Sequence, residues 1–393
     1  MPSANSSETG VTPGTLADRD SGRISRRCLV LRLLLVLLLV PIVHGFAGSG
    51  ARADNRTVPA LPTDWRATGL IDHPLVGKVW SSAQGAIVPA QDMGRAIALG
   101  RFVLLGEVHD NPDHHLWQAW GIRTISKLRG ARIVEGAPQI EIIAMEMLSV
   151  DQNAGIDRFY GRDVEVPRPR GAKAFGRMVG WETSGWPDYA IYAPIIDQAL
   201  FEQIVVVPAS ASRELTRNVS KEGLAALSIE EADRLALSKP LPEADAQALR
   251  DEIRDSHCGL MPETAFDRMS VVQRFRDATM ADALLSVATG KGGILIAGNG
   301  HVRRDRGVAH YLAARGVAPK DIVAVGIVEV AEGKVDPQAY AAGPGGQSIY
   351  DFVVFTPRLE RPDPCVAMRE SFGKKSAAPA AAPSSPAATP PAR

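Results

Sequence analysis

The densest group of ionisable side chains lies in residues 107–115. This stretch holds one Glu, two Asp and three of the eight His residues of the chain. Imidazoles and carboxylates are the groups that bind divalent metals and transfer protons near neutral pH. The stretch follows Gly106 directly, and an apolar run, Phe102–Leu105, precedes that glycine. The composition therefore predicts a metal-binding or proton-transferring site just beyond the end of a strand.

The spacing Gly-x-x-His occurs twice, at residues 106–109 and at residues 298–301. Each copy directly follows an apolar run, and a third apolar run, residues 142–145, ends at Glu146. In α/β proteins ligands bind in the crevice beyond the carboxyl ends of the parallel strands. We therefore expect both histidines and the neighbouring glutamates to face one another across one crevice.

Two chemical roles suit these four side chains. Glu107, His109, Glu146 and His301 could transfer protons as a catalytic set around a bound water. Three of them, His109, Glu146 and His301, could instead hold a divalent metal while Glu107 activates the water. The alternative for each motif is a chance spacing in which the imidazole bonds to a nearby carbonyl. The pairing of two motifs with two glutamates favours a functional site.

Aromatic residues gather at residues 181–194, which contain two of the six Trp and two of the six Tyr. Such a cluster can enclose a flat ligand, and tyrosine is a known axial ligand of haem iron. We expect Trp186 to form a wall, Tyr189 or Tyr192 to bind the iron, and Arg303 to pair with a propionate. A packed aromatic corner and a solvated arginine are the structural alternatives.

His114 and His115 are expected in the first turn of a helix that begins at Pro112, after the capping residue Asn111. The positive end of the helix dipole disfavours a charged imidazole at this position. At least one of the two rings is expected to lie at the surface.

Six short apolar runs are predicted to be strands of one sheet. They lack the alternation of half-exposed strands, and helical patterns separate most of them, which predicts an α/β fold with a parallel-rich sheet flanked by helices. Residues 213–256 predict an inserted helical hairpin, which would be either a lid over the site or a solvated excursion. The six runs are residues 102–105, 142–145, 204–207, 294–297, 322–328 and 352–355.

The two ends of the chain are expected to lie outside the folded domain. Residues 1–53 combine basic residues, an apolar run and a small-residue cleavage site before Asp54, which predicts a signal peptide. Residues 374–393 are rich in Ala and Pro, which predicts a disordered tail. Each end carries a net charge of +3, so residues 54–373 carry −6 in a neutral chain, which argues against a nucleic-acid partner. Export to the periplasm would allow Cys258 and Cys365 to pair, and two free thiols are the alternative.

Six segments in a fixed order carry a family resemblance. They are Leu-Leu-Gly-Glu-Val-His-Asp-Asn-Pro-Asp-His-His at 104–115, Ala-Met-Glu-Met at 144–147, Tyr-Ala-Ile-Tyr-Ala-Pro at 189–194, His-Cys-Gly at 257–259, Gln-Arg-Phe-Arg-Asp-Ala-Thr-Met-Ala at 273–281 and Ala-Gly-Asn-Gly-His-Val-Arg at 297–303. Together they resemble the ChaN-type haem-binding uptake family of the Tiki superfamily. The resemblance extends from about Leu104 to Leu312.

The resemblance implies an exported α/β protein that binds haem without covalent attachment and serves iron uptake. It places Glu107, His109, Glu146 and His301 on the motif positions of the superfamily. It leaves a homodimer and peripheral membrane association open, although no cysteine for lipid attachment follows the apolar run near the N-terminus. The alternative function is a metal-dependent hydrolase of the Tiki type, so the sequence leaves open whether the protein is an enzyme.

Overall fold

The computed structural model describes residues 58–131, 134–161 and 170–377, with the backbone alone for residues 371–377. These residues belong to the unit Ala53–Arg393. The expected signal peptide, residues 1–53, and residues 378–393 of the expected tail lie outside the described ranges. The last helix continues to Ala377, so the first four residues of the expected tail are helical.

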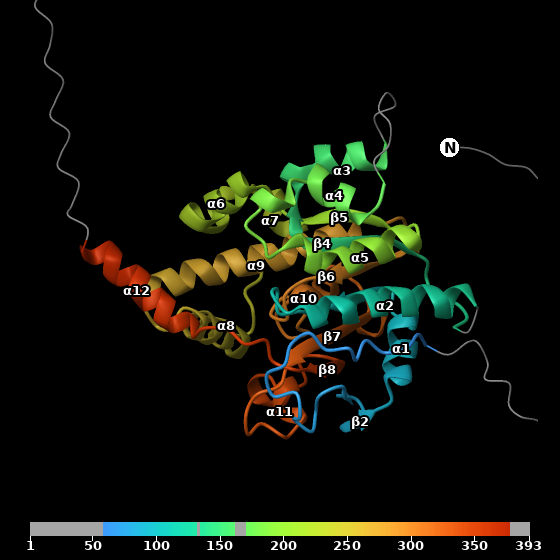
Figure 1. Ribbon diagram of the computed structural model, residues 1–393. Coiled ribbons are helices and arrows are strands. Elements are labelled where there is room, and N and C mark those ends of the chain that lie inside the picture. The colour runs from blue at the N-terminus through green and yellow to red at the C-terminus, as the bar shows by residue number, and fades with distance from the viewer. Residues whose placement is uncertain (1–57, 132–133, 162–169, 378–393) are drawn as a thin grey trace, which may run out of the picture. The chain divides into compact units, whose positions relative to one another are not determined.

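In the described part of the chain, eight strands form one mixed sheet with the order β2-β1-β8-β7-β3-β6-β4-β5 (Figure 1). β1 pairs antiparallel with β2 and β8, and the other neighbouring strands are parallel. The expected parallel-rich α/β fold is therefore confirmed. The strands are β1 (Val79–Ser81), β2 (Ala86–Val88), β3 (Phe102–Leu105), β4 (Ile140–Ser149), β5 (Val205–Ser210), β6 (Gly292–Ile296), β7 (Ile322–Glu329) and β8 (Phe352–Thr356).

All six predicted runs form strands, and β1 and β2 are two short additions at the antiparallel edge. β4 is longer than predicted, so Glu146 lies within the strand rather than after it. Its pairing with β6 nevertheless stops at Met145, opposite Ile296, and its register with β5 shifts after the same residue. Glu146 therefore still projects beyond the end of the neighbouring strand.

The central strands are buried on both faces, which explains their continuous apolar sequence. In β3, Val103 and Leu105 belong to one hydrophobic cluster, whereas Phe102 and Leu104 belong to the other. Helices α1 to α5 contribute to the first cluster, and α9 and α10 contribute to the second (Figure 1). Two apolar layers thus hold the strand ends in fixed positions.

The helices follow the predicted spacing in most places. Asn111 caps α2 by accepting a hydrogen bond from the Asp113 N–H, as the sequence predicts. The helices are α1 (Ala90–Leu99), α2 (Pro112–Gly130), α3 (Asn153–Tyr160), α4 (Ala172–Met178), α5 (Tyr189–Phe201), α6 (Arg213–Glu222), α7 (Ile229–Arg234), α8 (Glu243–Ser256), α9 (Glu263–Leu285), α10 (Val308–Ala314), α11 (Gln338–Ala341) and α12 (Pro364–Ala377).

The inserted segment, residues 213–256, contains three helices, α6 to α8, rather than the expected two-helix hairpin. The extra helix, α7, begins at a capping box in which Ser228 and Glu231 bond to each other's backbone N–H groups. It ends at Arg234, because Ala236 adopts a left-handed conformation with φ of 58° and the Leu237 N–H bonds back to the Ala232 carbonyl. The lid role of this segment stays a prediction.

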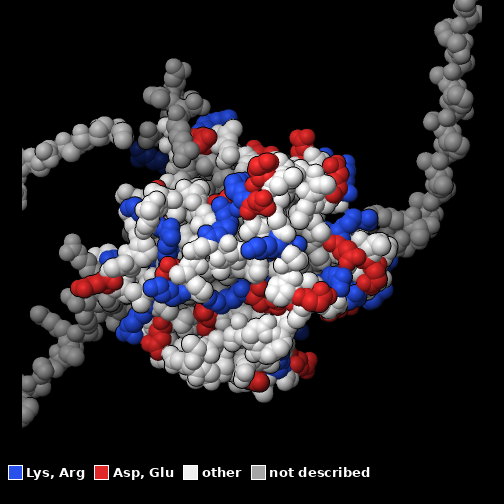
Figure 2. Space-filling view, turned by 180° about the vertical axis from the view of Figure 1, so that it is seen from behind, with Lys and Arg blue, Asp and Glu red and all other residues white. Residues whose placement is uncertain are grey.

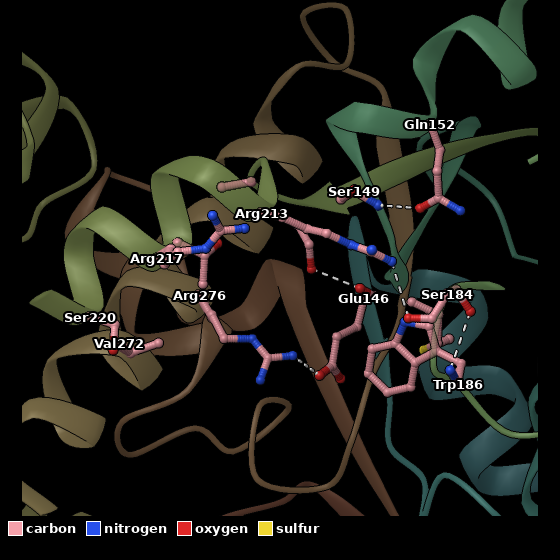
Figure 3. Close-up of a pocket in the computed structure, with 14 residues that line it drawn as sticks. Glu146, Ser149, Gln152, Ser184, Trp186, Arg213, Arg217, Ser220, Val272 and Arg276 are labelled. Carbon is pink, nitrogen blue, oxygen red and sulfur yellow. Dashed lines mark hydrogen bonds and ion pairs between the residues drawn. The ribbon is translucent and has the colours of Figure 1, made fainter. Parts of the chain in front are cut away.

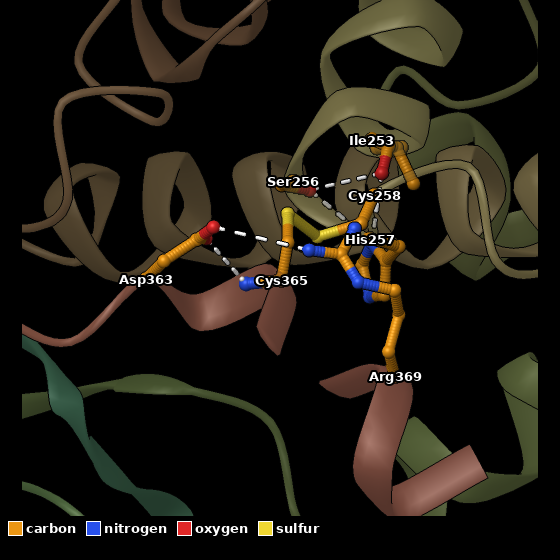
Figure 4. Close-up of a disulfide and its surroundings, with 7 residues drawn as sticks. All are labelled: Ile253, Ser256, His257, Cys258, Asp363, Cys365 and Arg369. Carbon is orange, nitrogen blue, oxygen red and sulfur yellow. Dashed lines mark hydrogen bonds and ion pairs between the residues drawn. A yellow bond between two sulfur atoms is a disulfide. The ribbon is translucent and has the colours of Figure 1, made fainter. Parts of the chain in front are cut away.

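A disulfide joins Cys258, just after α8, to Cys365 in α12, across 107 residues of sequence (Figure 4). The pairing that the sequence left open is therefore present in the structure. Among the described residues, no helix is long and apolar enough to cross a bilayer. On the face drawn in Figure 2, acidic and basic side chains are interspersed.

Candidate functional site

Two Gly-x-x-His motifs and Glu146 meet at the carboxyl ends of three adjacent strands. β6 lies between β3 and β4 in the sheet, so the segments that follow β3 and β6 are neighbours of Glu146. Glu146 is 4.0 Å from His109, measured from Oε2 to Nε2, and 3.3 Å from His301, measured from Oε1 to Nε2. The structure therefore brings the four predicted side chains together, while their chemical roles stay predictions.

The two glycines that open the motifs allow close packing of the loops. A side chain at Gly106 would collide with Asn299, whose amide bonds to the backbone of Ile327 in β7. A Cβ at Gly298 would lie 3.1 Å from Nε2 of His109. Neither glycine has a positive φ, so the close packing of the loops, and not an unusual backbone conformation, requires glycine at both positions.

Glu107 is the centre of a buried hydrogen-bond network. Its Oε1 accepts hydrogen bonds from His109 Nδ1 at 2.7 Å and from the Tyr192 hydroxyl at 2.8 Å. Its Oε2 accepts one from Gln118 Nε2 at 2.8 Å and lies 3.3 Å from His115 Nδ1. Burial alone would raise the pKa of Glu107, but the charge of His115 and the hydrogen bonds from both histidines lower it to about 2. The group is therefore a carboxylate that accepts hydrogen bonds from all sides.

This network orients His109. Because the carboxylate of Glu107 occupies Nδ1, the ring presents Nε2 to the crevice, where it makes no hydrogen bond to a described residue. Burial would lower the pKa of His109, but the bond to Glu107 and the charge of Glu146 raise it. The side chain is 36% exposed, and the ring of Trp186 packs edge-on against it with centroids 4.9 Å apart.

Glu146 is the second buried carboxylate. Arg276 of α9 forms an ion pair with its Oε1, and the backbone N–H of Gly298 donates to its Oε2 at 2.8 Å. Burial would raise the pKa of Glu146, but His301 and Arg276 hold it far below its usual range. Glu146 therefore stays ionised between a guanidinium and an imidazole.

His301 is held from the side of α9. Its Nδ1 lies 2.6 Å from Oδ1 of Asp277, and the Gln273 side chain lies 3.1 Å from its Nε2. Burial lowers the pKa of His301, but the two carboxylates of Glu146 and Asp277 outweigh it and raise the pKa to about 9. Burial also raises the pKa of Asp277, and the charge of His301 offsets part of that rise.

The expectation that His114 or His115 lies at the surface is wrong, because both rings are fully buried. The Val108 N–H donates to Nδ1 of His114 at 2.7 Å, so Nε2 carries the proton and donates to the Thr356 hydroxyl at 2.8 Å. Burial lowers the pKa of His114 to about 3, which keeps the ring neutral. The ring of His115 stacks on that of Tyr192 at a centroid distance of 4.0 Å.

A pocket of about 490 Å³ opens beside the network at the ends of β4 and β5 (Figure 3). Its volume falls within the usual range for small-molecule sites. In Figure 3, Arg217 and Arg276 lie on one side of Glu146 and Trp186 lies on the other, while Arg213 extends to the Ser184 carbonyl on the side of Trp186. The lining residues are Glu146, Met147, Ser149, Gln152, Ser184, Trp186, Ser210, Ala211, Arg213, Thr216, Arg217, Ser220, Val272 and Arg276.

The expected haem-binding residues are divided among different places. Trp186 lines the strand-end pocket, whereas Tyr192 is fully buried and donates to Glu107. Tyr189 lines a separate cavity of about 640 Å³, where its hydroxyl donates to the Ala172 carbonyl at 2.5 Å. Burial raises the pKa of both tyrosines well above the usual value. Arg303 is buried and pairs with Asp305 at 2.5 Å, so the structure gives it a carboxylate partner within the protein.

The metal-binding role of His109, Glu146 and His301 stays a prediction. Within the described ranges, no group of three or more His, Cys, Asp and Glu side chains is arranged to hold a metal ion. Glu146 is bound by Arg276, and both nitrogens of His301 face neighbouring side chains. A guanidinium inside the set supplies the positive charge that a cation would otherwise bring.

The sequence reasoning missed the residues of α9 that complete the site. Gln273, Arg276 and Asp277 lie in α9, within the segment 273–281. This segment contributes to the family resemblance, but the sequence predicted no role for these three side chains. Residues three and four apart lie on the same face of a helix, so this spacing could have indicated that the three side chains point to one site. Gln118, which donates to Glu107, was also missed, although it lies one helical turn after His114 and His115 and therefore on the same face of α2.

Solved structures resemble this chain to different degrees. A solved structure described as cofacial heme binding to ChaN of Campylobacter jejuni aligns with a TM-score of 0.52 and 19% identity, over 70% of this chain and 95% of that chain. The type III effector HopBA1 aligns at 0.34 with 12% identity, over 68% of this chain and 93% of that one. Erythromycin esterase EreC, as a mutant in its open conformation, aligns at 0.33 with 12% identity, over 70% and 95%. No curated protein sequence matches the chain.

The sequence match to a family covers more than half of the chain. The family described as haem-binding uptake, Tiki superfamily, ChaN matches residues 93–312, which include both Gly-x-x-His motifs, Glu146 and the α9 residues. The Campylobacter jejuni structure supports the same α/β fold. The chain therefore belongs to the ChaN family of haem-binding uptake proteins in the Tiki superfamily.

Proposed function

We propose that this protein binds haem non-covalently over the carboxyl ends of the sheet strands and contributes to iron uptake. Membership of the ChaN family is the observation that carries this proposal. The binding of haem by the Campylobacter jejuni protein, which shares the fold, is consistent with it. The strand-end pocket adds a structural argument, because it joins an aromatic wall to a set of arginines.

The residues around the pocket fit haem. His109 has a hydrogen-bonded Nδ1 and an Nε2 without a hydrogen bond, which is the arrangement that suits an imidazole ligand of a metal. Glu107 fixes the tautomer and the ring orientation, and Tyr192 and Gln118 fix Glu107 in turn. We propose His109 as the iron ligand and Trp186 as a wall. Haem, when bound, would supply the iron that the uptake function delivers.

Tyr189 is the second candidate for the iron ligand. It lines the separate cavity of about 640 Å³ together with Trp181. Binding iron through Tyr189 would require its hydroxyl to leave the Ala172 carbonyl and to lose a proton against a raised pKa. His109 has no hydrogen bond to break at Nε2 among the described residues, and its ring packs against Trp186, which lines the strand-end pocket. Its pKa is raised too, so the nitrogen without a partner, and not the ease of losing a proton, is our reason for placing the ligand beside this pocket.

The alternative function, a metal-dependent hydrolase, finds no support in the geometry. Two of the three predicted metal ligands already have partners within the protein, because Glu146 pairs with Arg276 and His301 pairs with Asp277. We propose instead that Glu107, Glu146 and His301 hold His109 and the wall of the pocket in position.

We also propose that the protein is exported to the periplasm, with cleavage before Asp54. The disulfide between Cys258 and Cys365 supports this, because such bonds persist in oxidising compartments. A homodimer that shares the flat ligand between two copies is part of the same proposal. Sedimentation of the protein with and without haem would test the dimer.

The haem proposal is tested by adding ferric haem to the purified full-length chain and recording the visible spectrum. A saturable shift of the Soret band is expected. The shift should change in position or be lost in His109→Ala, whereas Tyr189→Phe should retain the wild-type spectrum. Loss in Tyr189→Phe alone would move the ligand to the other cavity, and no shift in the unmodified chain would refute haem binding.

A further inference from the structure

Helix α6 presents two arginines to the strand-end pocket. Arg213 and Arg217 are one helical turn apart, so both project from one face of α6, and both line the pocket. Like charges at this spacing repel each other. Arg213 donates to the Ser184 carbonyl at 3.2 Å, and Arg217 makes no ion pair or hydrogen bond with a described residue. Neither guanidinium therefore forms an ion pair with a described residue, while the backbone N–H of Arg213 donates to the carboxylate of Asp151 at 2.9 Å.

Arg276 of α9 brings a third guanidinium to the same pocket. It is paired with Glu146, which is the one acidic side chain among the described lining residues. The lining thus carries three positive charges and one negative charge, a net charge of +2. Five hydroxyl side chains also line the pocket, and two of them, Ser184 and Ser210, already donate to backbone carbonyls. The five are Ser149, Ser184, Ser210, Thr216 and Ser220.

The opposite side of the pocket is less polar. Trp186 lies across the pocket from Arg217 and Arg276 in Figure 3, with Arg213 reaching over to Ser184 beside it. Met147, Ala211 and Val272 complete the apolar part of the lining. A ligand that matches both sides has a flat apolar body and anionic groups along one edge. Guanidinium groups recognise carboxylates with paired, charge-assisted hydrogen bonds.

We propose that Arg213 and Arg217 form a carboxylate-binding edge that recognises the two propionates of haem. This inference rests on the proposed function, and it assigns the side chains that bind the anionic part of the ligand. It replaces the role that the sequence suggested for Arg303, which is already paired with Asp305 and lies 3.6 Å from Glu252. It also gives the inserted segment a role in binding, because α6 is its first helix.

The test compares two ligands on matched variants of the full-length chain. The ligands are ferric haem and its dimethyl ester, which keeps the iron and the ring but has no propionate charge. The variants are Arg217→Gln and the control Lys221→Gln, which removes the same charge from the same helix at an exposed position outside the pocket lining. Affinities are measured from the Soret titration at fixed ionic strength.

We expect Arg217→Gln to weaken haem binding about tenfold or more, as is usual for loss of a charged hydrogen bond. The ester should bind the unmodified chain more weakly than haem does, and Arg217→Gln should have little further effect on it. Lys221→Gln should bind both ligands as the unmodified chain does.

Three results would overturn the inference while haem binding stands. They are haem affinity that does not depend on Arg217, equal losses for haem and for the ester in Arg217→Gln, and an equally large loss in Lys221→Gln. Absence of haem binding to the unmodified chain would instead refute the proposed function, and the inference with it. The two failures are therefore distinguishable in one titration series.

Discussion

The buried neutral ring of His114 should make the protein sensitive to mild acid. Burial lowers its pKa from 6.5 to about 3 in the folded state, whereas the unfolded chain keeps the ordinary value. Below pH 6.5 the unfolded chain binds a proton that the folded state refuses, so stability falls as the pH falls, down to about pH 3. Above pH 6.5 both states are neutral at this ring, and the effect vanishes.

The magnitude follows from the two pKa values. Each pH unit between them costs about 1.4 kcal/mol of unfolding free energy. At about pH 5 the loss from this one ring is therefore roughly 2 kcal/mol relative to pH 7. In the same window the carboxylates whose pKa is lowered by folding, such as Glu107 and Glu146, contribute little, because their unfolded pKa values lie below it. His301, with a pKa raised to about 9, adds stability that is fully present below pH 6.5 and is lost as the pH rises towards 9.

The assay is urea unfolding at about pH 5 and pH 7 for the unmodified chain and for His114→Gln. The variant should be less stable at both pH values, but its loss between pH 7 and pH 5 should be smaller by roughly 2 kcal/mol. Thr356→Val is the control, because it removes the hydroxyl that His114 donates to and leaves the titrating ring in place. Equal pH dependence in His114→Gln and in the unmodified chain would refute the reasoning.

Three further predictions follow from other contacts. Replacing Cys258 and Cys365 together by Ser should lower the unfolding free energy by about 2–5 kcal/mol, because the unfolded chain is then no longer restricted by a loop closed across 107 residues. An unchanged urea midpoint would show that the bond does not form in the protein. Tyr192→Phe should cost about 1–3 kcal/mol, since the buried carboxylate of Glu107 loses a donor, and a fully retained midpoint in urea would contradict the network. Mass spectrometry of the exported protein should find Asp54 at its N-terminus, and an intact leader would contradict the predicted cleavage.

Local sequence was sufficient to predict the strands and the side chains at their ends. Buried parallel strands require continuous apolar runs, so β3, β6 and β7 were found from composition alone. The position of Glu107 and Glu146 next to the strand ends then followed from the sheet edge that parallel strands share. β1 and β2 were not found, because three residues are too few to show a period.

The partners of those side chains depended on contacts between distant segments. Nothing near Glu146 in the sequence indicates that Arg276 pairs with it, and nothing near His301 indicates Asp277, because α9 reaches them only after the chain has folded over the sheet. The same holds for Tyr192, whose hydroxyl lies against Glu107, 85 residues away.

The sequence by itself determined which chemical groups the protein carries and at which edge of the sheet they lie. The tertiary structure decided which of them are buried, which are neutralised by a partner and which remain free to meet a ligand. The physical reason is that pKa values and hydrogen-bond roles depend on desolvation and on neighbouring charge, and both are set by residues far apart in the chain.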